Sequence, residues 1–369
     1  MNADGAPPLL AELTTMRVGG PATDVRRPAS EAELVDAVRG AWADASGDVE
    51  EDEAGWLVLG GGSNVVAPDA GLETPVVLTG GVRGVTPMGG PGRLRIAAGE
   101  PWDDVVAFAV AHGLAGIEAL SGIPGSAGAA PVQNIGAYGQ ELSETLVAIE
   151  FLDAERDELV RVDASDLGLG YRTSAIKRGR RGVVTAIELA LREDRDGVVA
   201  YEQLAAALDV PLGARVPLAD IRAAVLEVRR AKGMLDDGTL PSCGSFFVNP
   251  IVDDAFARGL PFEAPRWDVD GDEPPTVTPL GAPPPQREFR GRKRVKLSAA
   301  WLIERAGVRR GFRLPGSGAA ISPLHTLAIV NTGTATAADV VELASYVQLR
   351  VAADFAINLQ PEPRILAAR

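Results

Sequence analysis

The chain has 369 residues, 46% of them hydrophobic, and a formal net charge of −14 at pH 7. This length predicts two or three domains, and the hydrophobic content is ordinary for a protein with a sizeable core. The acidic balance argues against general binding to nucleic acid or to anionic membranes, because both need a basic surface. The single cysteine, Cys243, rules out a disulfide within the chain, and we expect a reducing, cytoplasmic location.

The sequence also argues against secretion, membrane insertion and metal binding. The N-terminus lacks a basic start followed by an apolar run, so we expect no signal peptide. No apolar run reaches about 18 residues, so we expect no membrane span. The two histidines, His112 and His325, belong to no Cys/His cluster with metal-ligand spacing, and we expect no metal site.

Helix and strand signals are mixed in the first half of the chain. Residues 30–33 form a capping box, which predicts a helix that starts there. The acidic stretch 44–53 is expected to be a solvated loop. Pro101 and Gly113 mark the first residue and the stop of a second helix. Strands are predicted at 56–59, 76–78, 94–98, 147–152 and 183–191.

The second half begins with an apolar stripe at helical spacing over 218–228. This stripe ends in three cations that suit the helix dipole, Arg229, Arg230 and Lys232. The segment 264–294 is rich in proline and charge and predicts a flexible insertion. A short helix, a strand and a longer helix follow, at 298–307, 327–330 and 336–351. Because no regular βαβ alternation is visible, the sequence predicts an α+β fold with several subdomains.

The stretch 121–140, SGIPGSAGAAPVQNIGAYGQ, carries no charge, five glycines and two prolines. It is too broken for a stable helix or a central strand, and too polar for a membrane span. It ends in the polar groups of Gln133, Asn134 and Tyr138. Irregular backbone with bare N–H groups suits a large anionic cofactor such as a flavin dinucleotide. A long structural loop is the alternative, although uncharged loops of this length are usually functional.

A second glycine-rich loop, Gly60-Gly61-Gly62-Ser63-Asn64, follows the strand predicted at 56–59. It is not G-x-G-x-x-G, no clear helix follows it, and it lacks the lysine of a P-loop, so it is neither a Rossmann nor a Walker site. A glycine run still brings three N–H groups close to a pyrophosphate. A tight turn explains the same residues equally well.

Two further segments place groups suited to a carboxylate substrate. Residues 171–174 offer Arg172 beside hydroxyls, and arginine binds carboxylates bidentately. Taken alone, this segment fits a surface ion pair better. Glu362 lies between Pro361 and Pro363, which fix its backbone and suit a positioned acid. A terminal edge strand is the alternative.

The segment 241–250, PSCGSFFVNP, has two serines that bracket Cys243 and a glycine, followed by two aromatic residues. Such a turn can present one serine hydroxyl to a pocket. We do not expect Cys243 to be a nucleophile, because no histidine is near it in sequence and a lone cysteine is usually buried. The chain has no G-x-S-x-G elbow, which argues against a hydrolase.

Five of these segments resemble, in the same order, motifs of the UDP-N-acetylenolpyruvoylglucosamine reductase family. Each motif alone is weak, whereas five in order are very specific. The resemblance runs from residue 15 almost to the C-terminal end, and it is closest to the branch with an extra tyrosine loop. The five motifs are at 60–64, 123–139, 171–174, 244–250 and 360–362.

The resemblance implies a two-part FAD-binding region of the vanillyl-alcohol-oxidase (PCMH) type, followed by an α+β substrate-binding domain. It places FAD-binding subdomain 1 at 1–81, subdomain 2 at 82–231 and the substrate domain at 232–354, with the tail 355–369 returning near the active site. The residues it implies for FAD are Gly60, Gly61, Gly62, Ser63, Asn64, Ser121, Gly125, Ser126, Gly128, Asn134 and Gly136.

The family's reaction is implied as well. NADPH reduces the FAD, and the reduced flavin converts UDP-N-acetylglucosamine-enolpyruvate to UDP-N-acetylmuramate, a peptidoglycan precursor. Arg172 and Glu362 stand where the family stabilises an enolic intermediate, and Ser245 where it places the proton donor. The choice of NADPH over NADH rests on the resemblance alone. We expect a monomer with no nucleic-acid partner.

The family's substrate contacts match less closely. Lys232 equally suits its helix end, and Tyr201 resembles the tyrosine of the extra loop. No residue of 264–294 clearly matches a family aromatic that contacts uridine. The basic run 287–296 is expected to be a solvated loop, with a phosphate contact as the alternative. The residues implied for the substrate are Tyr138, Tyr201, Lys232, Asn249, Arg310 and His325.

Two other functions compete with this interpretation. One is another flavin oxidase or dehydrogenase of the same superfamily, which should lack the Gly-Ser-Phe-Phe segment and the terminal Pro-Glu that this chain has. The other is a non-catalytic protein that binds a nucleotide sugar. The presence of Arg172, Ser245 and Glu362 together argues against it.

Overall fold

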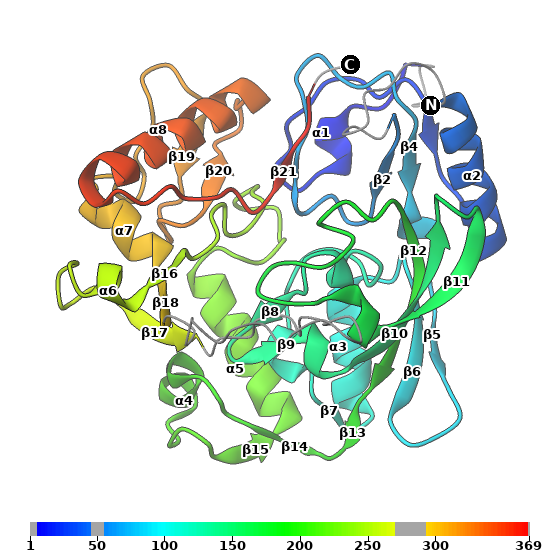
Figure 1. The fold of residues 1–369 in the computed structure, drawn as a ribbon, viewed down its shortest axis with the longest axis horizontal. Coiled ribbons are helices and arrows are strands. Elements are labelled where there is room, and N and C mark those ends of the chain that lie inside the picture. The colour runs from blue at the N-terminus through cyan, green and yellow to red at the C-terminus, as the bar shows by residue number, and fades with distance from the viewer. Residues whose placement is uncertain (1–5, 46–54, 270–292, 368–369) are drawn as a thin grey trace, which may run out of the picture.

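The computed structural model describes residues 6–45, 55–269 and 293–367. Helices and strands are mixed along these described residues, so the α+β class is confirmed. Figure 1 shows an N-terminal part (blue), a large sheet (cyan to green) and a C-terminal part (yellow to red) arranged around a common centre.

A parallel three-stranded sheet belongs to the N-terminal part. Its order is β1 (Val25–Arg26), β4 (Val76–Leu78) and β2 (Leu57–Leu59). The helix α2 (Glu31–Asp44) buries Leu34, Val38 and Ala41 against this sheet. Its N-cap Ser30 accepts from Glu33 N, but the Glu33 carboxylate returns to Ala29 N, so half of the predicted capping box forms.

The large sheet has five antiparallel strands, in the order β11 (Glu158–Asp163), β10 (Leu146–Asp153), β12 (Gly182–Ala190), β6 (Arg93–Ala97) and β5 (Val85–Pro87). Helix α3 (Trp102–Ala111) packs on it through Trp102, Val105 and Val106. Pro101 is the N-cap of α3 and not its first helical residue. Strand β11, which is mostly exposed, was not predicted.

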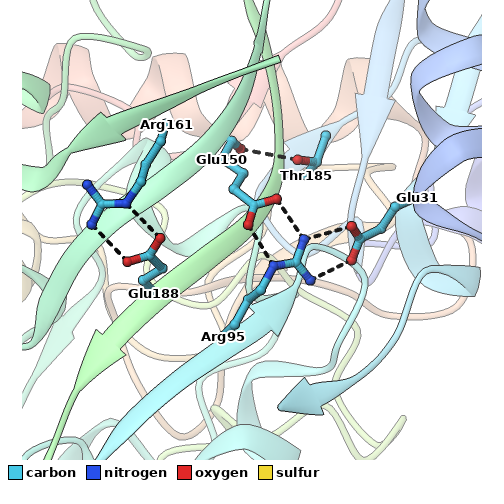
Figure 2. A network of polar contacts seen from close by, with 6 residues as sticks. All are labelled: Glu31, Arg95, Glu150, Arg161, Thr185 and Glu188. Atoms are coloured by element: carbon cyan, nitrogen blue, oxygen red, sulfur yellow. Dashed lines mark hydrogen bonds and ion pairs between the residues drawn. The ribbon is translucent and has the colours of Figure 1, made fainter. Parts of the chain in front are cut away.

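An ion-pair network fastens α2 to the large sheet (Figure 2). Arg95 of β6 binds Glu31, in the first turn of α2, at 2.7 Å and Glu150 of β10 at 2.6 Å. A second pair joins Arg161 of β11 to Glu188 of β12 at 2.8 Å. The two carboxylates on Arg95 raise the pKa of its guanidinium, so this group stays charged.

A smaller layer lies against α3. Helix α5 (Leu218–Ala231) buries its predicted stripe through Leu218, Ile221 and Val225. It packs on α4, through Leu204 and Ala205, and on Ala119 and Val199. The bounds of the short elements here are β7 (Leu114–Ala115), β8 (Gly136–Ala137), β9 (Gln140–Glu141), β13 (Arg192–Glu193), β14 (Asp196–Val198), α4 (Glu202–Leu208) and β15 (Arg215–Pro217).

The C-terminal part has its own core, which also takes in Met16, Val18 and Val66 from the N-terminal part. Asp69 caps the longest helix, α8 (Ala337–Phe355), by accepting from Ala337 N and Ala338 N at 2.7 and 3.1 Å. The N-terminal and C-terminal parts are therefore joined by apolar packing and by hydrogen bonds. The other elements here are β16 (Ile251–Asp253), α6 (Asp254–Ala257), β17 (Arg266–Val269), β18 (Arg294–Leu297), α7 (Ala299–Arg305), β19 (Ala319–Ile321) and β20 (Ile329–Asn331), while α1 (Leu10–Leu13) belongs to the N-terminal part.

Two predicted loops need correction at their ends. The insertion predicted at 264–294 begins and ends in a sheet, because β17 and β16 both pair with β18. This pairing also makes Arg294 and Lys296, at the end of the basic run 287–296, strand residues and not loop residues. The acidic stretch 44–53 starts inside a helix, since Asp44 ends α2 and pairs with Arg26. Residues 46–54 and 270–292 lie outside the described residues.

The C-terminal tail crosses the molecule from α8 back to the N-terminal part (Figure 1, red). Its strand β21 (Arg364–Ile365) pairs in parallel with β3 (Val65–Val66), directly after the loop 60–64. Glu362 precedes β21 by two residues. The tail thus brings Glu362 beside the first glycine-rich loop.

Candidate active site

A cavity of about 300 Å³ lies where the glycine-rich loops, the 241–250 segment and the tail meet. The loop 60–64 and residues from 123 to 136 form most of its wall. Arg172, Ser245 and Glu362, which come from three distant parts of the sequence, also line it. One space therefore receives all five segments that the sequence singled out.

The two glycine-rich loops approach each other so closely that side chains would not fit between them. A Cβ added at Gly61 would lie 2.9 Å from Gly125 Cα, and one at Gly60 would strike the Ser126 hydroxyl. Gly125 has φ +118°, a conformation that favours glycine. Ser126 Oγ is buried and has no hydrogen-bond partner among the described residues.

We expect Gly61→Ala to weaken FAD binding by about 10- to 100-fold, because overpacking of this kind costs about 1–3 kcal/mol. The new methyl group must push the two loops apart and distort the cavity wall. Gly80→Ala is the matched control, since a Cβ there meets nothing within 4 Å. Titration of each apoprotein with FAD measures the effect, and equal affinities for the two variants would contradict this account of the loops.

Arg172 and Glu362 form an ion pair inside the cavity, with Arg172 Nε 3.1 Å from Glu362 Oε1. Gln133 Nε2 donates to the same oxygen at 3.2 Å. Asn64 Nδ2 in turn donates to Gln133 Oε1 at 3.0 Å and to the Glu362 carbonyl at 3.3 Å. The amides of Asn64 and Gln133 therefore hold both the backbone and the carboxyl group of Glu362.

The Arg172 guanidinium is fixed by backbone carbonyls as well. It donates through Nη1 to Asn134 O at 3.3 Å and through Nη2 to Gly136 O at 2.7 Å. Two of its five N–H groups thus make hydrogen bonds to the backbone, and the others make no hydrogen bond to a described residue, although Nε lies beside Glu362. Arg172, Asn134 and Tyr138 all have positive φ, at 53°, 47° and 49°. Such strain in residues other than glycine clusters at functional sites.

Burial raises the pKa of the Glu362 carboxyl group, and the positive charges of Arg172 and Lys177 offset part of this rise. Arg172 Nε and Gln133 Nε2 both approach Oε1, so Oε2 is the oxygen left free to carry a proton. A neutral Glu362 can accept from Arg172 and donate to an incoming carboxylate at the same time.

Ser245 is positioned by a network of backbone hydrogen bonds. Glu362 N donates to Phe246 O at 2.9 Å, and Val248 N donates to Gln360 O at 3.0 Å. Phe246 and Phe247 are buried and anchor the segment in the C-terminal core. No hydrogen bond joins the Ser245 hydroxyl to another of the described residues, so it is available to a ligand.

Cys243 lines the same cavity but is not poised to react. Its thiol is buried and lies 3.3 Å from Val65 O. Burial raises its pKa to about 12, so the thiol stays protonated near neutral pH.

A second cluster joins Tyr138, Tyr201 and Lys232. The tyrosine rings meet edge to face with centroids 5.7 Å apart, and Lys232 Nζ lies 5.6 Å from the Tyr138 centroid. Gln203 accepts from Lys232 Nζ at 2.6 Å. Burial, and then the charge of Arg229, lowers the pKa of Lys232. These three predicted substrate residues therefore form one group.

His325 faces the same cluster, and Lys232 and Arg310 are the charged groups that act on it. Burial first, and then these two cations, lowers its pKa to about 4. The imidazole is therefore neutral near pH 7. Arg310 is more exposed, with its Nε 3.7 Å from Glu304 Oε1.

We expect His325 to make folding less stable in acid. The unfolded chain takes up a proton near pH 6.5 and the folded protein only near pH 4, so stability falls as the pH drops through this window. Between pH 7 and pH 5 the loss is about 2 kcal/mol, at about 1.4 kcal/mol per pH unit. Urea unfolding should show this loss shrinking in His325→Gln, but not in His112→Gln, which lies at the exposed end of α3. An unchanged slope in His325→Gln would contradict the burial argument.

The remaining predicted residues have structural contacts and do not line the cavity. Ser121 Oγ donates to Glu118 O, and Gly128 packs on Ala98. The Asn134 amide is occupied by Glu141, Ser143 and Gly170. Asn249 Oδ1 accepts from Ala299 N at the start of α7. Sequence reasoning missed Arg229, which lines the cavity, and gave no role to Gln133 or Lys177.

Comparison with known proteins points to one family. The family model described as UDP-N-acetylenolpyruvoylglucosamine reductase, C-terminal domain, matches residues 235–366, and the FAD binding domain model matches residues 22–163. The UDP-N-acetylenolpyruvoylglucosamine reductase of Leifsonia xyli is 52% identical over 97% of both chains. The chain belongs to the UDP-N-acetylenolpyruvoylglucosamine reductase family.

Other members of this family agree with the assignment. The reductase of Salinispora arenicola is 43% identical, over 96% of this chain and 93% of its own. The crystal structure of the Thermus caldophilus UDP-N-acetylenolpyruvylglucosamine reductase aligns over 98% of both chains with a TM-score of 0.63 and 26% identity. As a member of the reductase family, the protein is an FAD-dependent oxidoreductase.

The cavity suits the FAD of this reductase family. Its glycine walls leave backbone close to a ligand, and the unpartnered Ser126 hydroxyl offers a donor. In the described part of the chain, no group of three or more His, Cys, Asp or Glu side chains is placed to hold a metal ion. No helix among the same residues is long and apolar enough to cross a membrane.

Proposed function

We propose that this protein uses NADPH to reduce the enolpyruvyl ether of UDP-N-acetylglucosamine-enolpyruvate, forming UDP-N-acetylmuramate for peptidoglycan synthesis in the cytoplasm. The observation that carries the proposal is the meeting of Arg172, Glu362 and Ser245 in one cavity walled by glycine loops. A cation, a buried acid and a free hydroxyl are the groups that reduction of an enolpyruvyl ether requires.

Arg172 binds the substrate carboxylate through N–H groups that the backbone leaves free. Burial raises the pKa of Glu362, and its protonated form donates a second hydrogen bond to the same carboxylate. A charged Glu362 would instead repel it. Both groups stabilise the negative charge that develops there as the double bond is reduced.

When bound, FAD supplies the hydride that reaches the vinyl carbon distal to the carboxylate. The enolic intermediate then needs one proton on the carbon that bears the ether oxygen. Ser245 donates this proton from the cavity wall, and solvent replaces it. A serine is a weak acid, so the step depends on a strongly basic carbon, which the enolate provides.

The cluster of Tyr138, Tyr201 and Lys232 suits the diphosphate of the nucleotide sugar. The lysine offers a point charge, and the tyrosine hydroxyls offer hydrogen bonds. We further propose FAD-binding subdomains at 1–81 and 82–231 and a substrate domain at 232–354. This division is supported by the core of the C-terminal part, to which the N-terminal part contributes Met16, Val18 and Val66.

The proposed reaction is tested by product analysis. Purified protein with FAD, NADPH and the enolpyruvyl UDP-sugar should consume one NADPH per sugar and give a product heavier by two hydrogens. In D₂O, one deuterium should appear on the carbon that bears the ether oxygen. NADPH consumption that does not depend on the sugar would contradict the proposal.

A further inference from the structure

Arg229 is a buried cation in the cavity wall that the proposed reaction does not use. It is in the last turn of α5, and the whole residue is 7% exposed. Its guanidinium donates through Nε to Gly122 O at 3.0 Å and through Nη2 to Met234 O at 2.9 Å. It also shares a hydrogen bond with the Tyr138 side chain.

All three partners of Arg229 are neutral. Among the described residues, no carboxylate lies within 4.0 Å of its guanidinium, and the nearby Asp103 is held by Arg222 at 2.6 Å. Burial lowers the pKa of Arg229, but an arginine remains charged near neutral pH. A buried charge without a counter-ion is costly, because three neutral partners do not replace the water it has lost.

The surroundings indicate where the counter-ion belongs. Arg229 lines the cavity together with Ile123, Pro124 and Met234, which carry no charge. The stretch 121–140 is uncharged as a whole until Glu141 follows it. Tyr138, which contacts the guanidinium, also contacts Lys232 in the cluster of Tyr138, Tyr201 and Lys232. Arg229 is therefore positioned to attract an anion that binds in the cavity.

We propose that the guanidinium of Arg229 neutralises the negative charge of a ligand diphosphate bound in this cavity, and that Gly122, Met234 and Tyr138 hold the guanidinium in position. A planar guanidinium suits phosphate oxygens, and two of its five N–H groups are free of these three partners. The diphosphate belongs either to FAD or to the nucleotide sugar. The inference rests on the proposed function for the identity of these two ligands.

The test compares binding, so that it does not depend on turnover. Arg229→Gln keeps hydrogen-bond donors but removes the charge. Arg230→Gln is the control, because Arg230 is the next residue of α5, is exposed and pairs with Glu227 on the surface. Apoprotein is titrated with FAD and with riboflavin, which has no phosphate. FAD-loaded protein is titrated with UDP and with uridine.

We expect Arg229→Gln to lose about 100-fold in affinity for one diphosphate ligand and to keep its affinity for the matching ligand without phosphate. Loss for FAD alone assigns the cofactor, and loss for UDP alone assigns the nucleotide sugar. If the glutamine variant does not fold, Arg229→Lys should lose about tenfold by the same comparison, since it keeps the charge but not the fork.

The proposal is overturned if Arg229→Gln binds FAD and UDP as tightly as Arg230→Gln does. It is also overturned if riboflavin and FAD, or uridine and UDP, weaken equally, because the effect is then on cavity shape. Wild-type protein that binds no FAD would instead refute the proposed function, so the two failures are distinguishable.

Discussion

Ser245→Ala is expected to leave the reduction of bound FAD by NADPH intact and to slow the reduction of the sugar by about 10²–10⁴-fold. This is the range in which a positioned proton donor acts. The serine side chain makes no hydrogen bond to another described residue, so its removal should leave the cavity unchanged. Stopped-flow absorbance of the flavin measures the two half-reactions separately.

Ser242→Ala is the control for this variant. Ser242 belongs to the same turn, and its hydroxyl accepts from Gly244 N at 3.2 Å, but it does not line the cavity. We expect both half-reactions to survive in it. Equal loss of both half-reactions in Ser245→Ala would indicate distorted folding and would refute the role of proton donor.

Glu362→Gln should also keep its FAD and its reduction by NADPH, while the sugar half-reaction slows by about 10²–10³-fold. Glutamine has the shape of the neutral acid and can still accept from Arg172 and Gln133. It is a far weaker acid, however, so its hydrogen bond gains less as negative charge develops on the substrate. Glu342→Gln, on the exposed face of α8, should behave as wild type.

The pH dependence provides an independent check on Glu362. Burial raises its pKa, so the carboxyl group is neutral below that value and charged above it. The sugar half-reaction of the wild type should therefore fall as the pH rises through this pKa. Glu362→Gln cannot ionise, so its profile should lack this alkaline limb. An alkaline limb of the same size in the variant would assign the titration to another group.

The sequence predicted the α+β class, the core strands and the segments that line the cavity. This was possible because those features depend on local signals, such as the buried runs of β10 and β12 and the glycine loop that follows β2. The meeting of Arg172 and Glu362 depends instead on the tail crossing back to pair with β3. Nothing local to either residue encodes that path, and the resemblance to the family supplied it.

Other features were hidden because a residue type does not reveal its burial. Arg229 was interpreted as a cation that suits its helix end, yet it faces inward and lines the cavity. The side-chain amide of Asn134 is likewise occupied by Glu141, Ser143 and Gly170, which its sequence neighbourhood did not reveal. Strand β18 was interpreted as loop, because the pairing that stabilises it comes from residues far away in sequence.

The central claim is that electrons move from NADPH to FAD, and from FAD to an enolpyruvyl sugar, within this one cavity. Anaerobic spectroscopy of the purified protein tests it most directly. The protein should be yellow, lose its colour when one equivalent of NADPH is added, and regain it only when the enolpyruvyl UDP-sugar follows. A protein that takes up no FAD, or a bleached protein whose colour does not return with the sugar, would contradict the account.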